Sequence, residues 1–457
     1  MFLSTRFVPA GVLCVLVFVG SAGCACEEES VDGPTWYQDV APIVSEHCSG
    51  CHSPGNIAPF SLLTYDDAEA VAGWMAQQVE DGLMPPWGAQ DTDECATAGP
   101  WQHDPRLTDA EIDTLVEWSA NGMPEGDVED AASVPSPPST ALDSVSATLA
   151  PDVSYEATGT TDELICFSLD PEVDSTVWIN GFQVNPGNPE VVHHVLLFAD
   201  PGGLSEAQVG AEGYYPCFGG VGLNSATLVG AWVPGSLPTE YPEDSGLAIE
   251  PGDRMVMQVH YHPTGGDHAP DLTTVDVRWV ESEPQHYALM SLQGNASSEL
   301  GGLQPGPGDE GEVEFRIPAE AQGHTETILA ELGIGPNMDV RLWAVAPHMH
   351  LVGVDMKISV VRESPGPNEN SQECLVHVPR WDFDWQRIYQ YDLPTDELPR
   401  VEAGDTLELR CTYDNTLDNP GLVRALDEEG VSAPQDVYLG EGTLDEMCIG
   451  GFGAVVL

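Results

Sequence analysis

The spacing of apolar residues changes once along the chain and predicts two kinds of structure. In the first part, apolar residues recur at helical spacing in three segments, residues 36–52, 66–82 and 107–122. Thr108 is placed to cap the third segment and Gly122 to end it. We therefore expect a small all-α domain over residues 33–130.

The rest of the chain has the pattern of a β protein. Residues 131–150 are rich in Pro, Ser, Ala and Asp and are interpreted as a linker. Beyond them, short β-rich runs are broken by Pro and Gly turns, which is typical of antiparallel β-sandwiches. These runs are residues 175–181, 191–198, 254–262, 339–350 and 405–413. The part is too long for one small sandwich, so we expect two, over residues 151–283 and 284–457. The predicted fold class is mainly β, with two antiparallel β-sandwich domains after the all-α domain.

The first 23 residues have the features of an export signal. Arg6 precedes an apolar run over residues 7–20, which is short for a membrane span. The following Ser-Ala-Gly-Cys resembles a bacterial lipoprotein processing site, although Ser21 stands where an apolar residue is usual. Lipidation of Cys24 and ordinary cleavage nearby are the two alternatives. Either predicts an exported protein, periplasmic or at the cell surface, that touches a membrane only through a lipid on Cys24.

The charge balance excludes some partners. The chain has 13 Lys+Arg against 75 Asp+Glu, a net charge of −62, and Lys357 is its one lysine. Such a surface repels nucleic acids and anionic membranes. It fits an acidic exported protein, or one suited to salty surroundings that screen its self-repulsion.

The number of cysteines available for disulfides is odd. Of eleven cysteines, Cys14 leaves with the signal, Cys24 is the lipidation candidate, and two belong to the motif described next. Seven remain, an odd number, so at least one is unpaired or one assignment is off. They are Cys26, Cys95, Cys166, Cys217, Cys374, Cys411 and Cys448.

Cys48, Cys51 and His52 form a C-x-x-C-H motif, the attachment site of a c-type haem. Two thiols bind the haem covalently, and the adjoining histidine is an iron ligand. A redox dithiol or half a zinc site is the alternative. Met84, on a Pro-braced loop, is the predicted second ligand, whereas Met75 falls in a helical pattern and is expected to pack. His47 is expected to face solvent. Residues 33–127 resemble a class I cytochrome c.

Three histidine pairs fall on β-like runs: His193 with His194, His260 with His262, and His348 with His350. A lone strand histidine is usually structural, but six imidazoles are enough for two metal sites. Imidazole suits Zn, Cu, Fe and Ni, and a thioether would select copper. Met447 offers a thioether near the C-terminus, although core packing is its ordinary role.

The order His-His, His-x-His, Pro-His-Met-His and Leu-Asp-Glu-Met-Cys resembles the copper type II, ascorbate-dependent monooxygenases. That family includes the peptidylglycine α-hydroxylating and dopamine β-monooxygenases, and the resemblance covers residues 150–457. It implies two coppers. His193, His194 and His260 would hold the electron-transfer copper; His348, His350 and Met447 would hold the catalytic, oxygen-binding copper. It also implies a Cys411–Cys448 disulfide and leaves His262 as a supporting or surface residue.

Three positions depart from the peptide-amidating members of that family. The arginine that binds the substrate carboxylate there is replaced by Ala346, and the asparagine and tyrosine after the Met-Cys pair are replaced by Ile449 and Gly451. A glycine-extended peptide is therefore not the expected substrate.

The resemblance implies hydroxylation of a C–H bond of a small molecule with O2, with ascorbate or another donor supplying electrons. Because the haem motif lies on the same chain, a further hypothesis is that the haem feeds electrons to the His193/His194/His260 copper, replacing or relaying ascorbate. The main alternative is a non-enzymatic copper- and haem-binding electron carrier or scavenger. A zinc hydrolase is a third, but the motifs show no carboxylate base beside the histidines.

Overall fold

The computed structural model describes residues 33–457 apart from short gaps. The gaps are residues 55–57, 136–138, 140, 160, 218–219, 264, 267, 295–301, 367–369 and 441. The predicted export signal, Cys14, Cys24 and Cys26 lie outside the described residues. Within the described part, no helix combines the length and apolar character needed to cross a membrane.

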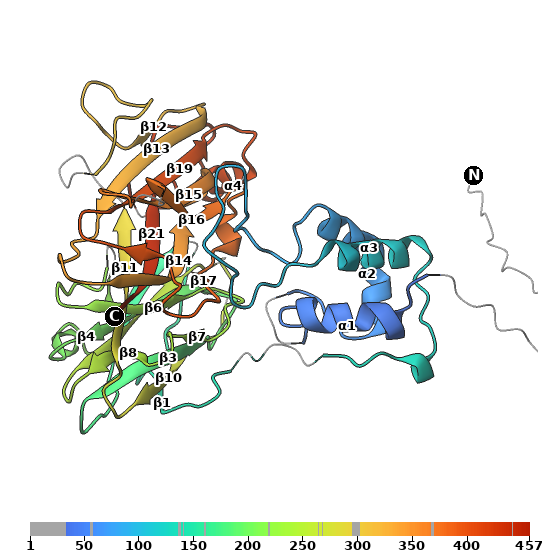
Figure 1. The fold of residues 1–457 in the computed structure, drawn as a ribbon, viewed down its shortest axis with the longest axis horizontal. Coiled ribbons are helices and arrows are strands. Elements are labelled where there is room, and N and C mark those ends of the chain that lie inside the picture. Colours follow the sequence, from blue (N-terminus) through green and yellow to red (C-terminus); the bar gives the residue numbers. More distant parts are fainter. Residues whose placement is uncertain are drawn as a thin grey trace, which may run out of the picture.

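The N-terminal region is helical and lies beside the β region (Figure 1). Its elements are a continuous helical stretch made of η1 (Trp36–Val40), α1 (Ala41–Ile43) and η2 (Val44–Cys48), then α2 (Tyr65–Glu80), α3 (Asp109–Ala120) and η3 (Val128–Asp130). The Thr108 hydroxyl accepts from the backbone N–H of Glu111, and the backbone N–H of Thr108 donates to the Glu111 carboxylate. Thr108 therefore caps α3 as expected. The first helix ends at Cys48, before the C-x-x-C-H turn closes, rather than at residue 52.

The helical region has its own small core. Trp36 and Trp118 lie with ring centres 6.0 Å apart, and both are buried. The N–H of the Trp118 indole donates to the Pro124 carbonyl, which ties the end of α3 to the chain that follows it. Burial of two large aromatic rings is the main apolar contribution in a unit of this size.

The remainder is mainly β and forms several sheets. The strands of the first half are β1 (Ala147–Leu149), β2 (Glu163–Leu169), β3 (Val177–Asn185), β4 (Val192–Asp200), β5 (Tyr215–Pro216), β6 (Thr227–Trp232), β7 (Thr239–Glu240), β8 (Ser245–Ile249), β9 (Arg254–Tyr261), β10 (Thr274–Val280) and β11 (His286–Gly294), with η4 (Leu204–Ala207) between β4 and β5. The strands of the second half are β12 (Arg316–Ile317), β13 (Gln322–Glu331), β14 (Val340–His348), β15 (Gly353–Val361), β16 (Gln372–Val378), β17 (Tyr389–Gln390), β18 (Arg400–Val401), β19 (Thr406–Asp414), β20 (Val437–Tyr438) and β21 (Ile449–Val456), with η5 (Phe383–Trp385) and α4 (Pro420–Glu429).

The two halves share strands across the expected boundary. β11 pairs with β21 from Tyr287 to Gly294 and also with β8 and β6, so one sheet runs from the first half into the second. A second sheet has the order β13-β19-β15-β16. A division at residues 283/284 therefore falls just before the strand that joins the two halves. Strand β1 lies inside the expected linker, where it pairs with β10, so residues 131–150 are not a linker throughout.

The chain between α2 and α3 leaves the helical region and packs on the β region. The Trp101 ring stacks on Tyr391 at 4.6 Å, and the Trp87 ring meets Tyr389 edge-on at 5.0 Å. Cys95 forms a disulfide with Cys374 on β16. The expected domain of residues 33–130 is therefore not self-contained. The sequence carried no signal for this, because neither tryptophan nor cysteine identifies its partner.

The Cys95–Cys374 disulfide should be a main tether between the two regions. It closes a sequence separation of 279 residues, and long loops gain most from cross-linking. We expect the double variant Cys95→Ser/Cys374→Ser to lower the free energy of unfolding by about 2–5 kcal/mol. Chemical denaturation measures that loss, and limited proteolysis should then cut within residues 87–104. Unchanged stability and unchanged cleavage would contradict the tether.

Candidate metal centres

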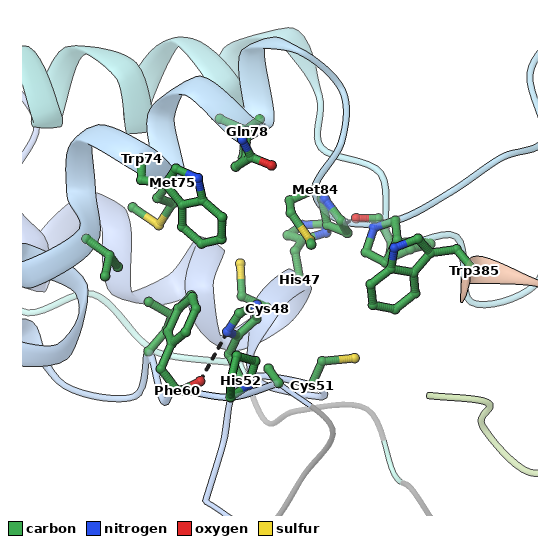
Figure 2. Close-up of a pocket in the computed structure, with 18 of the residues that line it drawn as sticks. His47, Cys48, Cys51, His52, Phe60, Trp74, Met75, Gln78, Met84 and Trp385 are labelled. Atoms are coloured by element: carbon green, nitrogen blue, oxygen red, sulfur yellow. Dashed lines mark hydrogen bonds between the residues drawn. The ribbon is translucent and has the colours of Figure 1, made fainter. Parts of the chain in front are cut away.

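The C-x-x-C-H turn opens into an apolar cavity of about 360 Å³ (Figure 2). The N–H groups of Cys51 and His52 both donate to the Cys48 carbonyl, so the motif forms one tight turn at the end of η2. Cys48 and Cys51 line the cavity and are the free thiols of the described residues; the other six described cysteines form disulfides. Two unpaired thiols and a histidine thus face one apolar space.

His52 is held with one ring nitrogen available. Its Nδ1–H donates to the Phe60 carbonyl at 3.2 Å, and the two rings lie 4.6 Å apart (Figure 2). With Nδ1 occupied in this way, Nε2 carries the lone pair that can bind a metal. Burial lowers the pKa of His52, which favours the neutral ring that ligation requires.

Both methionines considered from the sequence line this cavity. Met84 follows α2 on the loop continued by Pro85 and Pro86, as expected, and Met75 comes from α2 and is buried. Figure 2 shows both on the side of the cavity away from His52. The expectation that Met75 packs is correct as far as its burial goes, but its sulfur is also placed to compete with Met84.

His47 does not face solvent, contrary to expectation. Its side chain is 13% exposed and lines the same cavity, with Nδ1–H donating to the Pro105 carbonyl and Nε2 at 3.3 Å from Glu111. The helix turn places His47 next to α3, and a sequence position adjacent to the motif does not show which neighbour will cover it.

The β region closes the cavity with residues that the sequence did not single out. Asp384, Trp385 and Arg387, from η5 and the chain after it, line its wall. The Arg387 guanidinium lies 5.6 Å from the centre of the Trp87 ring, and its Nε is buried without a partner among the described residues. Burial lowers the pKa of Arg387, which means that keeping its guanidinium charged beside this cavity costs free energy.

A second cluster joins His193, His194 and His260. On a regular strand, His193 and His194 would face opposite sides of the sheet. The register between β4 and β9 shifts between Val192 and His194, so His194 pairs directly with His260 and His193 is the extra, bulged residue. Adjacent histidines can share one ion only where the strand departs from regular geometry, and this bulge is such a departure.

The three imidazoles converge with the same ring nitrogen of each, Nδ1, facing the others. His194 Nδ1 lies 3.3 Å from His193 Nδ1 and 3.2 Å from His260 Nδ1. A ring nitrogen has either one N–H or one lone pair, so His194 Nδ1 can satisfy only one of these neighbours by a hydrogen bond. Imidazole nitrogens that share a tetrahedral ion at about 2.0–2.1 Å lie about 3.3 Å apart. The spacing therefore fits a metal ion, and these three side chains form a group that could hold one.

Asp162 supports this cluster and was missed in the sequence. Its carboxylate lies 3.2 Å from His260 Nε2 and accepts from His262 Nδ1 at 2.5 Å. Burial would raise the pKa of Asp162, but the two imidazoles outweigh it and hold this pKa well below its usual range. Asp162 thus orients His260 from behind, as carboxylates do for metal-bound histidines, and is not a free base. His262 has the supporting place expected for it.

In the His348–His350 pair, the ring nitrogens left free are Nε2, whereas Nδ1 atoms converge in the three-histidine cluster. His348 is the last residue of β14, and His350 follows it, with Met349 between them fully buried and turned away. His348 Nδ1–H donates to the Gln386 Oε1 at 2.7 Å, and His350 Nδ1–H donates to the Asp445 carbonyl at 3.0 Å. Both Nε2 atoms are left for a ligand, and the ring centres are 5.4 Å apart.

Met447 is attached to this pair through its neighbour. Glu446, fully buried, accepts from the N–H groups of His350 and Met447 with one oxygen and from those of Val352 and Gly353 with the other. The Tyr413 hydroxyl donates to the Met447 carbonyl, and the next residue, Cys448, forms the expected disulfide with Cys411. These contacts bring the main chain of Met447 beside His350.

The two clusters open into one cavity of about 290 Å³. Its lining includes His193, His260 and His350, together with Phe383 and the exposed Asp384. The Phe383 ring stacks on His193 at 5.1 Å and meets the His350 ring at 6.1 Å, so it stands between the clusters. A molecule in this cavity would therefore contact both sets of histidines.

Burial keeps these imidazoles uncharged. It lowers the pKa of His193 and of His348 to about 3, and that of His350 to about 4. Neighbouring histidines contribute in the same direction. Near pH 7 all three are neutral, and a metal ion need not displace protons to bind them.

The comparisons with known proteins do not assign a family. No family model matches the chain, and no curated protein matches it. Solved structures similar to it include the major capsid protein P2 of bacteriophage PM2, with 8% identity, a TM-score of 0.28 and coverage of 68% of this chain and 96% of that one. Another is the VP2 subviral particle of infectious bursal disease virus, with 12% identity, a TM-score of 0.19 and coverage of 68% and 70%. These scores are too low to bear on function.

Glu446 should control the His348–His350 pair and not the other cluster. In Glu446→Gln, an amide places N–H groups against backbone N–H groups, so we expect a loss of about 2–3 kcal/mol in the free energy of unfolding. Copper titration should show loss of binding at His348 and His350, with binding at the three-histidine cluster retained. Glu243→Gln, at an exposed position, is the control. Equal loss at both clusters would contradict this role.

Proposed function

We propose that this chain is an exported copper-dependent monooxygenase that hydroxylates a C–H bond of a small organic substrate with O2. The observation that carries it is the pair of histidine clusters facing one cavity. One cluster offers three converging Nδ1 atoms and the other two free Nε2 atoms. Two different imidazole sites around a space of substrate size suit a reaction that needs two one-electron centres.

The donor set favours copper at both clusters. Neutral imidazoles suit several first-row metals, and Met447 adds the thioether that favours Cu(I) at the His348–His350 pair. Asp162 behind His260 and Gln386 behind His348 fix the rings for ligation. Zinc hydrolysis is less well supported, because Asp162, which lines the cavity, is engaged by the imidazoles of His260 and His262 and is not free to act as a base.

When bound, the two coppers would each supply one electron, so that RH, O2, two electrons and two protons give ROH and water. The chain's own residues do the rest. The cavity walls hold the substrate between the clusters, and Phe383 limits its position from one side. The neutral imidazoles of His193 and His348 would bind the metal without first losing a proton.

Two strand positions near His348 lack the carboxylate anchor of the peptide-amidating monooxygenases. Ala346 and Gly451 face each other on β14 and β21, and a Cβ added at Gly451 would lie 3.1 Å from that of Ala346. No cationic side chain stands at either position. A peptide carboxylate would find no partner there, in agreement with the departure seen in the sequence.

The helical region fits a c-type haem. Cys48 and Cys51 would attach it, His52 would ligate iron through Nε2, and the apolar lining would exclude water. The buried Arg387 guanidinium fits a haem propionate, which would give its unpaired Nε an anionic partner. This region is thus proposed as a cytochrome c-like module that relays electrons from ascorbate or another donor.

The proposed location is outside the cytoplasm, with lipid on Cys24 as the proposed anchor. Three disulfides fit an oxidising compartment. The absent carboxylate anchor also favours one alternative, a copper- and haem-binding electron carrier that hydroxylates nothing. Oxygen uptake with no hydroxylated product across a broad substrate screen would favour that carrier.

Met447→His tests the monooxygenase directly. A third imidazole keeps copper bound but removes the thioether that favours Cu(I), so we expect two coppers per chain and loss of hydroxylation. Elemental analysis gives the copper count, and product analysis with ascorbate and O2 gives the activity. Met338→His, at an exposed methionine, is the control. Zinc without copper in the reconstituted wild type, or full activity in Met447→His, would contradict the proposal.

The second haem ligand is tested by comparing Met84→Ala with Met75→Ala. We expect Met84→Ala to lower the haem reduction potential and to abolish the sulfur-to-iron absorption band, because thioether ligation raises the potential. Met75→Ala should leave that band in place and instead cost about 2–5 kcal/mol of stability as a core truncation. The reverse pattern would assign the ligand to Met75.

A further inference from the structure

We propose that the segment Phe383–Arg387 is an electron bridge, which passes electrons from the C-x-x-C-H cavity to His348 through Trp385 and Gln386. It rests on the proposed function, since it needs haem in one cavity and copper at the other site. It goes beyond that function in naming the residues of the route and its point of entry. The sequence had favoured entry at the His193/His194/His260 cluster.

One end of the segment forms a wall of the C-x-x-C-H cavity. Trp385 and Arg387 both line it, and Figure 2 shows the Trp385 ring at the cavity edge, on the side of Cys51 and Met84. The neighbouring Gly235 approaches from the β region, since a Cβ added there would lie 3.8 Å from Cys51 Sγ. A haem attached to Cys51 would therefore have its edge against this segment.

The other end reaches the histidines. The side chain of Gln386, the residue after Trp385, accepts from His348 Nδ1 at 2.7 Å. Its amide N–H in turn donates to the Phe383 carbonyl at 3.0 Å, which fixes the orientation of its oxygen. The same short segment places Phe383 against His193.

The route has one hydrogen bond and otherwise only covalent bonds between Trp385 and the His348 ring. Electron tunnelling weakens steeply with distance and is more efficient through bonds than across gaps. The contact from Phe383 to His193 is a ring stack at 5.1 Å without a hydrogen bond, so it is the weaker path. The step is a single electron transfer: Fe(II) haem becomes Fe(III) as Cu(II) becomes Cu(I), with no bond made or broken.

Contacts on both sides hold the segment against the helical region. Arg380 donates to the carbonyls of Asp81 and Gly82 at the end of α2, each at 3.1 Å. The Trp87 ring packs on Tyr389 two residues after Arg387, and the Cys95–Cys374 disulfide closes the same interface. The route is therefore part of a fixed interface and does not depend on a transient encounter.

Flash photoreduction of the haem tests the bridge. The full-length protein, loaded with Cu(II) and ferric haem under argon, is reduced by one photogenerated electron, and the haem absorbance is followed as it returns to the ferric state. We expect Gln386→Leu and Trp385→Leu each to slow this return by about tenfold, or about 1.4 kcal/mol in activation free energy. Gln386→Glu keeps an acceptor for His348 Nδ1–H and should restore most of the rate.

The controls separate the bridge from other effects. Gln102→Leu removes a contact of the same interface, to the Tyr391 carbonyl, and should leave the rate unchanged. Copper content and the haem potential are measured for each variant, because Gln386 also orients His348. Among the described residues, Trp385 makes no hydrogen bond to His348 or His350. The Trp385→Leu variant therefore tests the route even where Gln386→Leu loses copper.

The outcomes distinguish the bridge from the function. A wild-type protein that binds no haem or no copper contradicts the proposed function itself. A wild type that transfers the electron, with Gln386→Leu and Trp385→Leu at the wild-type rate, overturns the bridge and leaves the function standing. A strong effect of Phe383→Leu, with Gln386→Leu unchanged, moves the entry point to His193 and also overturns it.

Discussion

The one-residue bulge at the start of β4 is the constraint on which the three-histidine cluster depends. Without it, His193 would point to the other face of the sheet and His194 and His260 would remain an ordinary cross-strand pair. With it, three partly buried imidazoles meet through Nδ1, and hydrogen bonds among them cannot satisfy all three. Such an arrangement leaves ring nitrogens that a shared metal ion could satisfy.

The sequence identified candidate site residues better than it predicted their placement. The C-x-x-C-H motif and the three histidine pairs were recognisable because each function needs those residue types at short, fixed spacing. The Cys411–Cys448 disulfide followed from the resemblance and is present in the structure. Sharing of one ion by His193 and His194 requires a bulge, but its position could not be predicted, because a register shift depends on the partner strand β9, which sequence spacing does not contain.

The parts that sequence could not supply are contacts between distant segments. Asp162, Gln386 and Glu446 are common polar residues in unremarkable stretches, and their roles come only from what the fold brings beside them. The same holds for the docking of residues 87–104 on the β region, which made the predicted helical domain incomplete. Its aromatic residues pack across the interface with Tyr389 and Tyr391, nearly three hundred residues further along the chain.

A fused electron source also fits the charge of the chain. With a net charge of −62, the surface repels small anionic reductants such as ascorbate and lowers their local concentration near the histidine clusters. Salt weakens this repulsion but acts mainly beyond a Debye length of about 8 Å at physiological ionic strength. In the proposed arrangement, a haem beside Trp385 would pass electrons within the protein, and no anion would need to approach the cavity. The acidic surface and the fixed interface between the two regions thus both favour the proposed route, in which electrons from an external donor would reach the copper sites through the haem.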